Sequence, residues 1–218
     1  MAGSGRVGSF VPERVAGVGA AAPDPALVAE LRNVSGLSSA ASDALDTLGL
    51  RLSVAATAIA PLGTPSAVIG RVLTLRYLPA RTTAPGPEPL GRLAHRTLFD
   101  LAATGDIVVI SAPPRIDASV LGGEALEAAR GAGIAAVIVD GAVRDIDELL
   151  AVGVPVWAAR RTTITARGRL EAAEINGPLE IGGVQVQPGD IVFADLSGIS
   201  FVPAERFEEV ARRILGRS

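Results

Sequence analysis

The residues best suited to chemistry lie between one predicted strand and one predicted helix. Residues 134–139 form an unbroken apolar run, which predicts a strand buried on both faces, and the apolar spacing of residues 146–151 predicts a helix. The positions between them include Asp140, Gly141, Arg144 and Asp145. Because open α/β sheets bind ligands where a buried strand ends and a helix begins, this junction is the candidate site.

The same residues also have a purely structural interpretation. Asp145 can cap the helix, while Asp147 and Glu148 in its first turn favour the positive end of the helix dipole and Arg144 is solvated. The residues of this junction leave both interpretations open.

A second candidate is a pair of glycines at the start of another predicted helix. Leu121, Gly122, Gly123 and Glu124 lead into a helix that is expected to end near Arg130. Glycines at this place let a ligand approach backbone N–H groups that have no partner within the helix. The pair predicts a cradle for a carboxylate or a phosphate, although an ordinary turn explains it equally well.

The elements that must position these residues alternate along the middle of the chain. Further strands are predicted at residues 67–78, closely approached or bent at Gly70, and at 107–110 and 154–159; helices are predicted at 23–32, 38–48, 90–103 and 204–215. Residues 162–202 contain short β segments separated by turns. We therefore expect an α/β protein with parallel strands beside an all-β segment, packed in layers around one core.

The domain prediction is a single domain over residues 23–218. Residues 1–22 are rich in Gly and Ala without a clear period and are expected to form a flexible leader. The proline-rich residues 84–89 are predicted to be a turn or short linker.

Three residue types are rare or missing, and each excludes a class of chemistry. All 20 basic residues are Arg, so Schiff bases, pyridoxal phosphate enzymes and a Walker P-loop are excluded. The chain has no Cys, and His95, expected to be structural, is its one histidine. A metal would therefore be held by Asp or Glu oxygens and water, which suits Mg²⁺ or Mn²⁺.

Charge and hydropathy indicate the kind of partner. A net charge of −3 and 3% aromatic residues argue against nucleic-acid binding. Every apolar run is shorter than the roughly 18–20 residues that span a membrane. Residues 1–22 imitate a signal peptide only weakly, so a cytoplasmic protein with a small polar partner is expected.

Residues 121–124, followed by Asp-Gly-Ala-Val-Arg-Asp-Ile-Asp-Glu at residues 140–148, resemble the RraA-like family. That family contains the regulator of ribonuclease E activity and the 4-hydroxy-4-methyl-2-oxoglutarate aldolases. The similarity also includes residues 42–45, 94–96, 105–109 and 188–192, and it covers about residues 26–212 in a consistent order. It implies a swivelling β/β/α layered domain, usually in a homotrimer with sites near the subunit contacts.

The resemblance also implies roles for particular residues. In the aldolases the Arg of the Arg-Asp pair holds the pyruvate portion of the substrate and the Asp anchors a divalent metal, which here are Arg144 and Asp145. The glycine loop supplies backbone donors, here from Leu121, Gly122 and Gly123.

One position departs from the family aldolases. These enzymes commonly have an acidic residue directly after the first loop glycine, where it orders a water used for proton transfer. This chain has Gly123 there and Glu124 one residue later. Glu124 is accordingly a candidate catalytic relay, with a solvated helix-end charge as the alternative.

Chemistry supports the same function independently. Forming a pyruvate enolate requires an electron sink, and without lysine a metal Lewis acid is the remaining route. The predicted function is a divalent-metal-dependent carbon–carbon lyase on small 2-oxo acids, by aldol cleavage to pyruvate or decarboxylation of oxaloacetate. The alternatives are a non-catalytic regulator of a ribonuclease E-type protein and a family member recruited to other metal-assisted chemistry.

Overall fold

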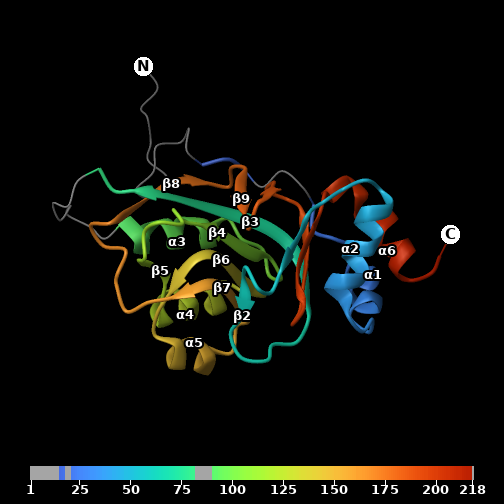
Figure 1. Ribbon diagram of the computed structural model, residues 1–218, viewed down its shortest axis with the longest axis horizontal. Helices are drawn as coiled ribbons and strands as arrows, with labels where there is room; N and C mark the ends of the chain where they lie inside the picture. Colours follow the sequence, from blue (N-terminus) through green and yellow to red (C-terminus); the bar gives the residue numbers. More distant parts are fainter. Residues whose placement is uncertain (1–14, 18–20, 82–89, 218) are drawn as a thin grey trace, which may run out of the picture.

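A mixed sheet runs through the computed structural model, which describes residues 15–17, 21–81 and 90–217 (Figure 1). Its strand order is β1-β12-β11-β3-β4-β6-β7-β2, with β5 beside β6 and β8 beside β3, and β9 and β10 pair separately. The strands are β1 (Ser53–Ala55), β2 (Ala60–Pro61), β3 (Val68–Pro79), β4 (Ile107–Ser111), β5 (Ser119–Leu121), β6 (Ala136–Val143), β7 (Val156–Arg161), β8 (Leu170–Ile175), β9 (Leu179–Ile181), β10 (Val184–Val186), β11 (Ile191–Ala194) and β12 (Gly198–Val202).

The middle of the sheet is parallel, as the apolar runs predict. Strand β4 pairs in parallel with both β3 and β6, and β6 pairs in parallel with β7. One face of these strands packs against α3 (Leu90–Asp100), α4 (Gly123–Gly131) and α5 (Ile146–Val152). The opposite face packs against β9 and β10 around the fully buried Trp157. The strand ends that carry the candidate site are thus held between two apolar layers.

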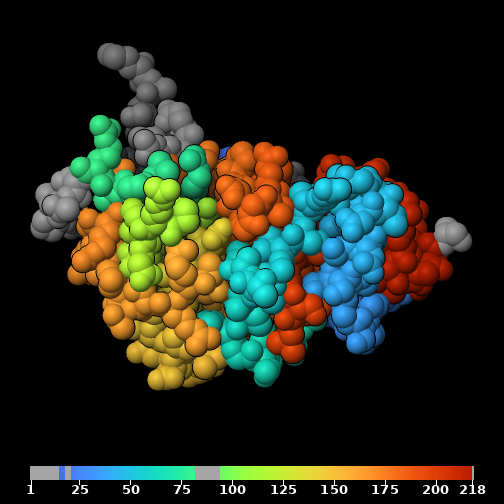
Figure 2. All heavy atoms as spheres, in the orientation of Figure 1, coloured from blue at the N-terminus to red at the C-terminus, as the bar shows by residue number. Residues whose placement is uncertain are grey.

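A second group of helices covers the antiparallel end of the sheet. Helices α1 (Pro25–Leu31), α2 (Leu37–Thr47) and α6 (Phe207–Ile214) enclose an apolar cluster with β11 and β12. Figures 1 and 2 show this group at one end of the molecule, away from α3, α4 and α5. The predicted α/β layered fold is confirmed, with its helices divided between two parts of one sheet.

Two long-range contacts explain how α2 begins and why a glycine stands at position 70. The start of α2 is capped by Asp195, whose carboxylate accepts from the Ser38 N–H at 2.9 Å and from the Ser38 Oγ at 2.6 Å. The close approach predicted at Gly70 is present, because an added Cβ would lie 2.9 Å from Ile107 Cγ1. Glycine is needed at this point for space between neighbouring strands.

Strand β6 extends further than the sequence predicts. Asp140 and Gly141 belong to β6, which continues to Val143. The Asp140 carboxylate accepts a hydrogen bond of 2.8 Å from the Gly182 N–H in the turn between β9 and β10. Asp140 therefore attaches the hairpin of β9 and β10 to the sheet. We no longer count it among the residues of the candidate site.

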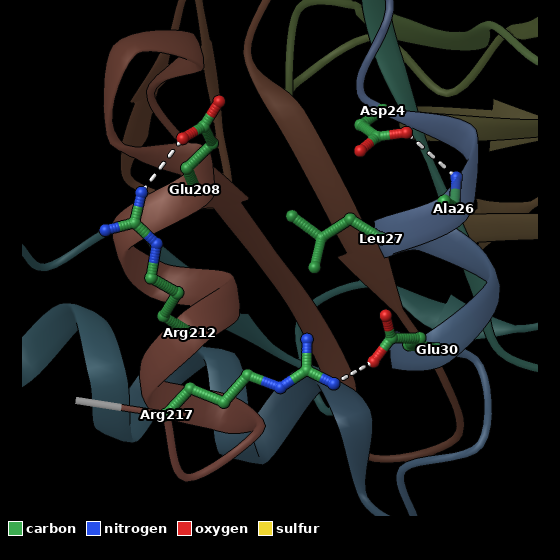
Figure 3. Close-up of a pocket in the computed structure, with 7 residues that line it drawn as sticks. All are labelled: Asp24, Ala26, Leu27, Glu30, Glu208, Arg212 and Arg217. Atoms are coloured by element: carbon green, nitrogen blue, oxygen red, sulfur yellow. Dashed lines mark hydrogen bonds and ion pairs between the residues drawn. The ribbon is translucent and has the colours of Figure 1, made fainter.

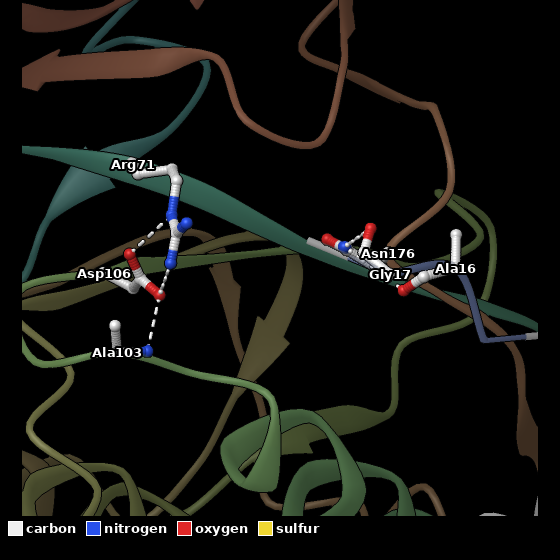
Figure 4. Close-up of polar contacts among 6 residues, drawn as sticks. All are labelled: Ala16, Gly17, Arg71, Ala103, Asp106 and Asn176. Carbon is white, nitrogen blue, oxygen red and sulfur yellow. Dashed lines mark hydrogen bonds and ion pairs between the residues drawn. The ribbon is translucent and has the colours of Figure 1, made fainter. Parts of the chain in front are cut away.

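Two buried polar contacts connect distant segments (Figure 4). Arg71 Nε and Nη2 donate to the two carboxylate oxygens of Asp106 at 2.9 and 2.8 Å. Asn176 Nδ2 donates to the carbonyl oxygens of Ala16 and Gly17 at 3.3 and 2.8 Å, which ties residues 16 and 17 to the end of β8. Residues 1–14 and 18–20 of the predicted leader lie outside the described residues. The predicted linker at residues 84–89 lies outside them as well.

None of the helices in the described ranges is both long and apolar enough to cross a membrane.

The buried carboxyl group of Asp190 should make the stability of the fold depend on pH. Burial raises its pKa to about 6, although the Gln187 N–H hydrogen bond opposes the shift. A carboxyl group with a raised pKa in the folded state stabilises the fold least when ionised, so its contribution falls as the pH rises from about 4 to about 6. Asp190→Asn should leave stability at pH 4 nearly unchanged and raise it by about 2 kcal/mol at pH 7. Urea unfolding at both pH values measures this, and an equal change at both would contradict the assignment.

Candidate active site

The junction between β6 and α5 has an unusual backbone conformation. Asp145 occupies the N-cap position of α5, but its φ of 55° and ψ of 49° are left-handed. Its side chain makes no capping hydrogen bond to the described backbone of that helix. A left-handed aspartate costs free energy, and such conformations concentrate at functional sites. The capping interpretation of Asp145 therefore fails, and its carboxylate is available for another role.

That carboxylate faces Arg144. The distance from Arg144 Nε to Asp145 Oδ2 is 3.1 Å, and the two side chains are 42% and 37% exposed. An ion pair with this much exposure contributes little to stability, so both groups remain accessible to a ligand. The Arg144 N–H also donates to the Leu121 carbonyl oxygen at 3.1 Å, which joins this junction to the glycine loop.

The two loop glycines leave the space that the charged side chains occupy. Gly122 has an extended backbone, yet an added Cβ would lie 2.8 Å from Asp145 Oδ2 and 3.3 Å from Arg144 Nε. A Cβ on Gly123 would overlap Glu148 Oε2 and would lie 2.9 Å from Glu148 Cβ. The predicted glycine cradle and the predicted Arg-Asp pair are therefore one cluster, formed where α4 and α5 begin.

Glu148 is the residue that sequence reasoning missed. Its sequence position predicts only a first-turn charge on α5, whereas the structure places its carboxylate directly over Gly123. Its spacing from Asp145 was the available signal, because residues three apart at a helix start lie on the same face. The cluster thus contains two carboxylates and one guanidinium.

The other predicted site residues are placed as follows. Leu121 is buried at the end of β5, and its carbonyl oxygen accepts from Arg144 N–H and Ser119 Oγ. Glu124 is an exposed acidic residue in the first turn of α4. That placement fits a helix-end charge, and its role as a proton relay stays a prediction. His95 is buried and stacks on Phe99 at a ring distance of 6.0 Å, as a structural histidine would.

A surface hollow between α1 and α6 lies outside this cluster (Figure 3). Two ion pairs line it: Arg212 Nη2 lies 3.0 Å from Glu208 Oε2, and Arg217 pairs with Glu30. The fifth charged side chain, Asp24, accepts a hydrogen bond from the Ala26 N–H. Because these charges are already compensated and exposed, the hollow lacks the convergent groups that chemistry requires.

Comparison with known proteins identifies the family of this chain. A family model described as Aldolase/RraA, RraA-like, matches residues 38–200, a range that includes both glycines and the Arg-Asp pair. The chain belongs to the RraA-like family. The predicted family and fold are therefore confirmed.

Two relatives show how far the similarity extends. A protein of Halalkalibacterium halodurans named "Putative 4-hydroxy-4-methyl-2-oxoglutarate aldolase" is 34% identical over 174 residues, which are 79% of this chain and 75% of that protein. Protein DlpA of Legionella pneumophila is 31% identical over 193 residues, 88% of this chain. The aligned part spans only 30% of DlpA. Homologues with aldolase names support a lyase at a coarse level.

Solved structures of the family have the same fold. Streptomyces coelicolor RraAS2, described as an unusual member of the RNase ES inhibitor RraA protein family, superimposes with a TM-score of 0.76 at 28% identity, covering 89% of this chain and 92% of that chain. RraA from Thermus thermophilus, described as an RNA-processing inhibitor, gives a TM-score of 0.57 at 25% identity, with 75% and 92% covered. The family thus carries names of both enzymes and inhibitors.

Proposed function

We propose that this protein is a divalent-metal-dependent carbon–carbon lyase that acts on small 2-oxo acids. Its reactions would be aldol cleavage of a 4-hydroxy-4-methyl-2-oxoglutarate-type substrate to pyruvate and decarboxylation of oxaloacetate to pyruvate and CO₂. The observation that carries the proposal is the left-handed Asp145, whose carboxylate faces Arg144 and Gly122 instead of capping α5.

The donors of the cluster fit a hard divalent cation. Asp145 supplies a carboxylate oxygen, which Mg²⁺ and Mn²⁺ prefer, and it faces the glycine loop. Among the described residues no group of three or more His, Cys, Asp and Glu side chains is arranged to hold a metal ion. One carboxylate nevertheless suffices for Mg²⁺, which usually keeps several waters and takes one or two protein carboxylates.

Each residue of the cluster has a role in the proposed reaction. Arg144 grips the substrate carboxylate with its planar fork, and the N–H groups at the start of α4 orient the substrate beside Gly122 and Gly123. A bound cation supplies the Lewis acidity that draws electron density towards the 2-oxo group. The Glu148 carboxylate lies beside Gly123, where it would hold a water. In the aldol cleavage this water takes the proton of the C4 hydroxyl as the C3–C4 bond breaks and returns it to C3 of the pyruvate enolate; in the decarboxylation it gives a proton to C3 after CO₂ has left.

The direct test is pyruvate release from oxaloacetate with Mg²⁺ or Mn²⁺, before and after addition of a chelator. Oxaloacetate also loses CO₂ in solution with free metal, so the rate is measured against metal without protein. We expect a protein-dependent rate that the chelator removes and that added metal restores. A rate equal to that of metal alone, for this and for 4-hydroxy-4-methyl-2-oxoglutarate, would refute the proposal.

Arg144→Lys tests whether substrate binding needs the planar guanidinium of Arg144 or only its positive charge. Lysine keeps the positive charge but cannot form two parallel hydrogen bonds with a carboxylate. We expect KM for oxaloacetate to rise about tenfold and kcat to fall, with metal affinity nearly unchanged. Steady-state kinetics and calorimetric metal titration measure both, and an unchanged KM would remove Arg144 from substrate binding.

The second candidate function is a non-catalytic regulator of a ribonuclease E-type protein, which the names of the two RraA structures favour. Binding of this protein to such a ribonuclease, without any protein-dependent lyase rate, would establish it. Recruitment to other metal-assisted chemistry is the third proposal. It predicts metal binding at Asp145 without pyruvate release.

The assembly expected from the family resemblance is a homotrimer in the cytoplasm. Light scattering at micromolar protein concentration should give three times the mass of one chain, and the mass of a monomer would count against it.

A further inference from the structure

We infer that Arg160 binds a second carboxylate of the substrate, so that this site selects dicarboxylic over monocarboxylic 2-oxo acids. The inference rests on the proposed function, whose two substrates are already dicarboxylic, and it assigns the residue that holds their second carboxylate.

Arg160 lies at the same edge of the sheet as the candidate site. It belongs to β7 and pairs in register with Ala142 of β6, two residues before Arg144. The next residues continue this contact, because the Thr162 N–H donates to the Val143 carbonyl oxygen at 2.9 Å. Strands β6 and β7 are parallel, so their carboxyl ends meet at one edge, which is where such sheets bind ligands.

The guanidinium of Arg160 lacks the carboxylate partner that Arg71 and Arg76 have. Its Nε and Nη2 atoms are buried, and neither has a hydrogen-bond partner within the described part of the chain. In Arg71 the same two atoms bind both oxygens of Asp106, and in Arg76 they bind Glu174 Oε2 at 3.2 and 2.7 Å. The side of the fork that binds carboxylates elsewhere in this protein is thus unpaired in Arg160.

An unpaired buried guanidinium is costly, and such exceptions require an explanation. Arg160 as a whole is only partly buried, and the inference requires its long side chain to turn the two unpaired donors towards the sheet edge. In the proposed reaction Arg144 is committed to the carboxylate next to the 2-oxo group. A substrate with a second carboxylate needs a second cation, and Arg160 supplies a planar fork for it.

Two inert ligands of the same chain length isolate this contact. 2-Oxoglutarate has a distal carboxylate where 2-oxopentanoate has a methyl group, and both carry the 2-oxo acid end that Arg144 would bind. Calorimetry with saturating Mg²⁺ should show that the wild-type protein binds 2-oxoglutarate at least about tenfold more tightly. Arg160→Met should abolish this preference while changing the affinity for 2-oxopentanoate less than twofold.

Arg161→Met is the matched control. Arg161 is the exposed next residue of β7, so the control removes one positive charge from the same strand end and should retain the preference. Circular dichroism checks folding, and Arg160→Gln is read in the same way if Arg160→Met does not fold.

The outcomes separate this inference from the proposed function. If the wild-type protein shows no preference, or if the preference survives in a folded neutral variant of Arg160, Arg160 has a structural role and the inference is wrong. If neither oxo acid binds and no lyase rate is found, the proposed function itself is overturned, and the inference with it. Loss of the preference in the Arg160 variants alone supports both.

Discussion

Asp145→Asn should reduce the rate of pyruvate release from oxaloacetate by about 100-fold or more, since a cation held by few protein ligands depends strongly on each carboxylate. Asparagine has nearly the same shape and, like aspartate, tolerates the left-handed conformation that Asp145 adopts at φ 55°. The backbone between β6 and α5 should therefore be preserved. Calorimetric titration should show Mn²⁺ affinity at least about tenfold weaker.

Asp147→Asn is the control for that variant. Asp147 is also an exposed acidic residue in the first turn of α5, so its replacement removes the same charge from the same helix end. Metal affinity and turnover should change less than about twofold. Unchanged Mn²⁺ affinity in Asp145→Asn, or equal losses in both variants, would show that Asp145 is not a metal ligand.

The parallel core was predictable because its strands are buried on both faces. An unbroken apolar run such as residues 134–139 has few alternatives, and the structure places it in β6. The end of β6 was not predictable in the same way. Asp140 looks like a loop residue, but Gly182, 42 residues later, donates the hydrogen bond that allows its carboxylate to stay in the strand. Local patterns do not encode such a contact.

Because local patterns do not encode long-range contacts, only part of the candidate site was predictable from the sequence. Arg144, Asp145 and the glycines could be found from their types and their position beside a buried strand. Glu148 already had a sufficient local explanation at the positive end of α5, so its approach to Gly123 on α4 followed only from the packing of the two helices. The left-handed backbone of Asp145 likewise depends on the surrounding structure.

This packing also changes the expectation for Gly123. The family resemblance implies an acidic residue at this position, and on that ground alone Gly123→Asp would be expected to raise activity. In the structure an added Cβ overlaps the Glu148 carboxylate, so aspartate would displace Glu148 and place two negative charges together. We therefore expect Gly123→Asp alone to lower the rate, by about tenfold or more.

Glu148 should be the carboxylate that performs the proton transfer otherwise assigned to the loop acid. Glu148→Gln should lower kcat by about 100-fold, within the range that general acid–base groups contribute. Glu124→Gln is the matched control. Because Glu124 is exposed in the first turn of α4, its loss should change kcat less than about threefold if it is only a helix-end charge.

The double variant Gly123→Asp with Glu148→Ala gives the decisive comparison. Removing the Glu148 side chain beyond Cβ takes its carboxylate away from Gly123, and the new aspartate supplies a carboxylate from the opposite helix. The Cβ of residue 148 remains 2.9 Å from the added Cβ, so the two helix starts must also move slightly apart. If one carboxylate at this place is what the reaction needs, the double variant should recover to within about tenfold of the wild-type rate, although each single change lowers it. Such a recovery is a strong coupling between neighbouring residues, which independent sites do not show. A double variant no faster than Glu148→Ala alone would mean that Glu148 acts in another way than by placing a carboxylate beside Gly123.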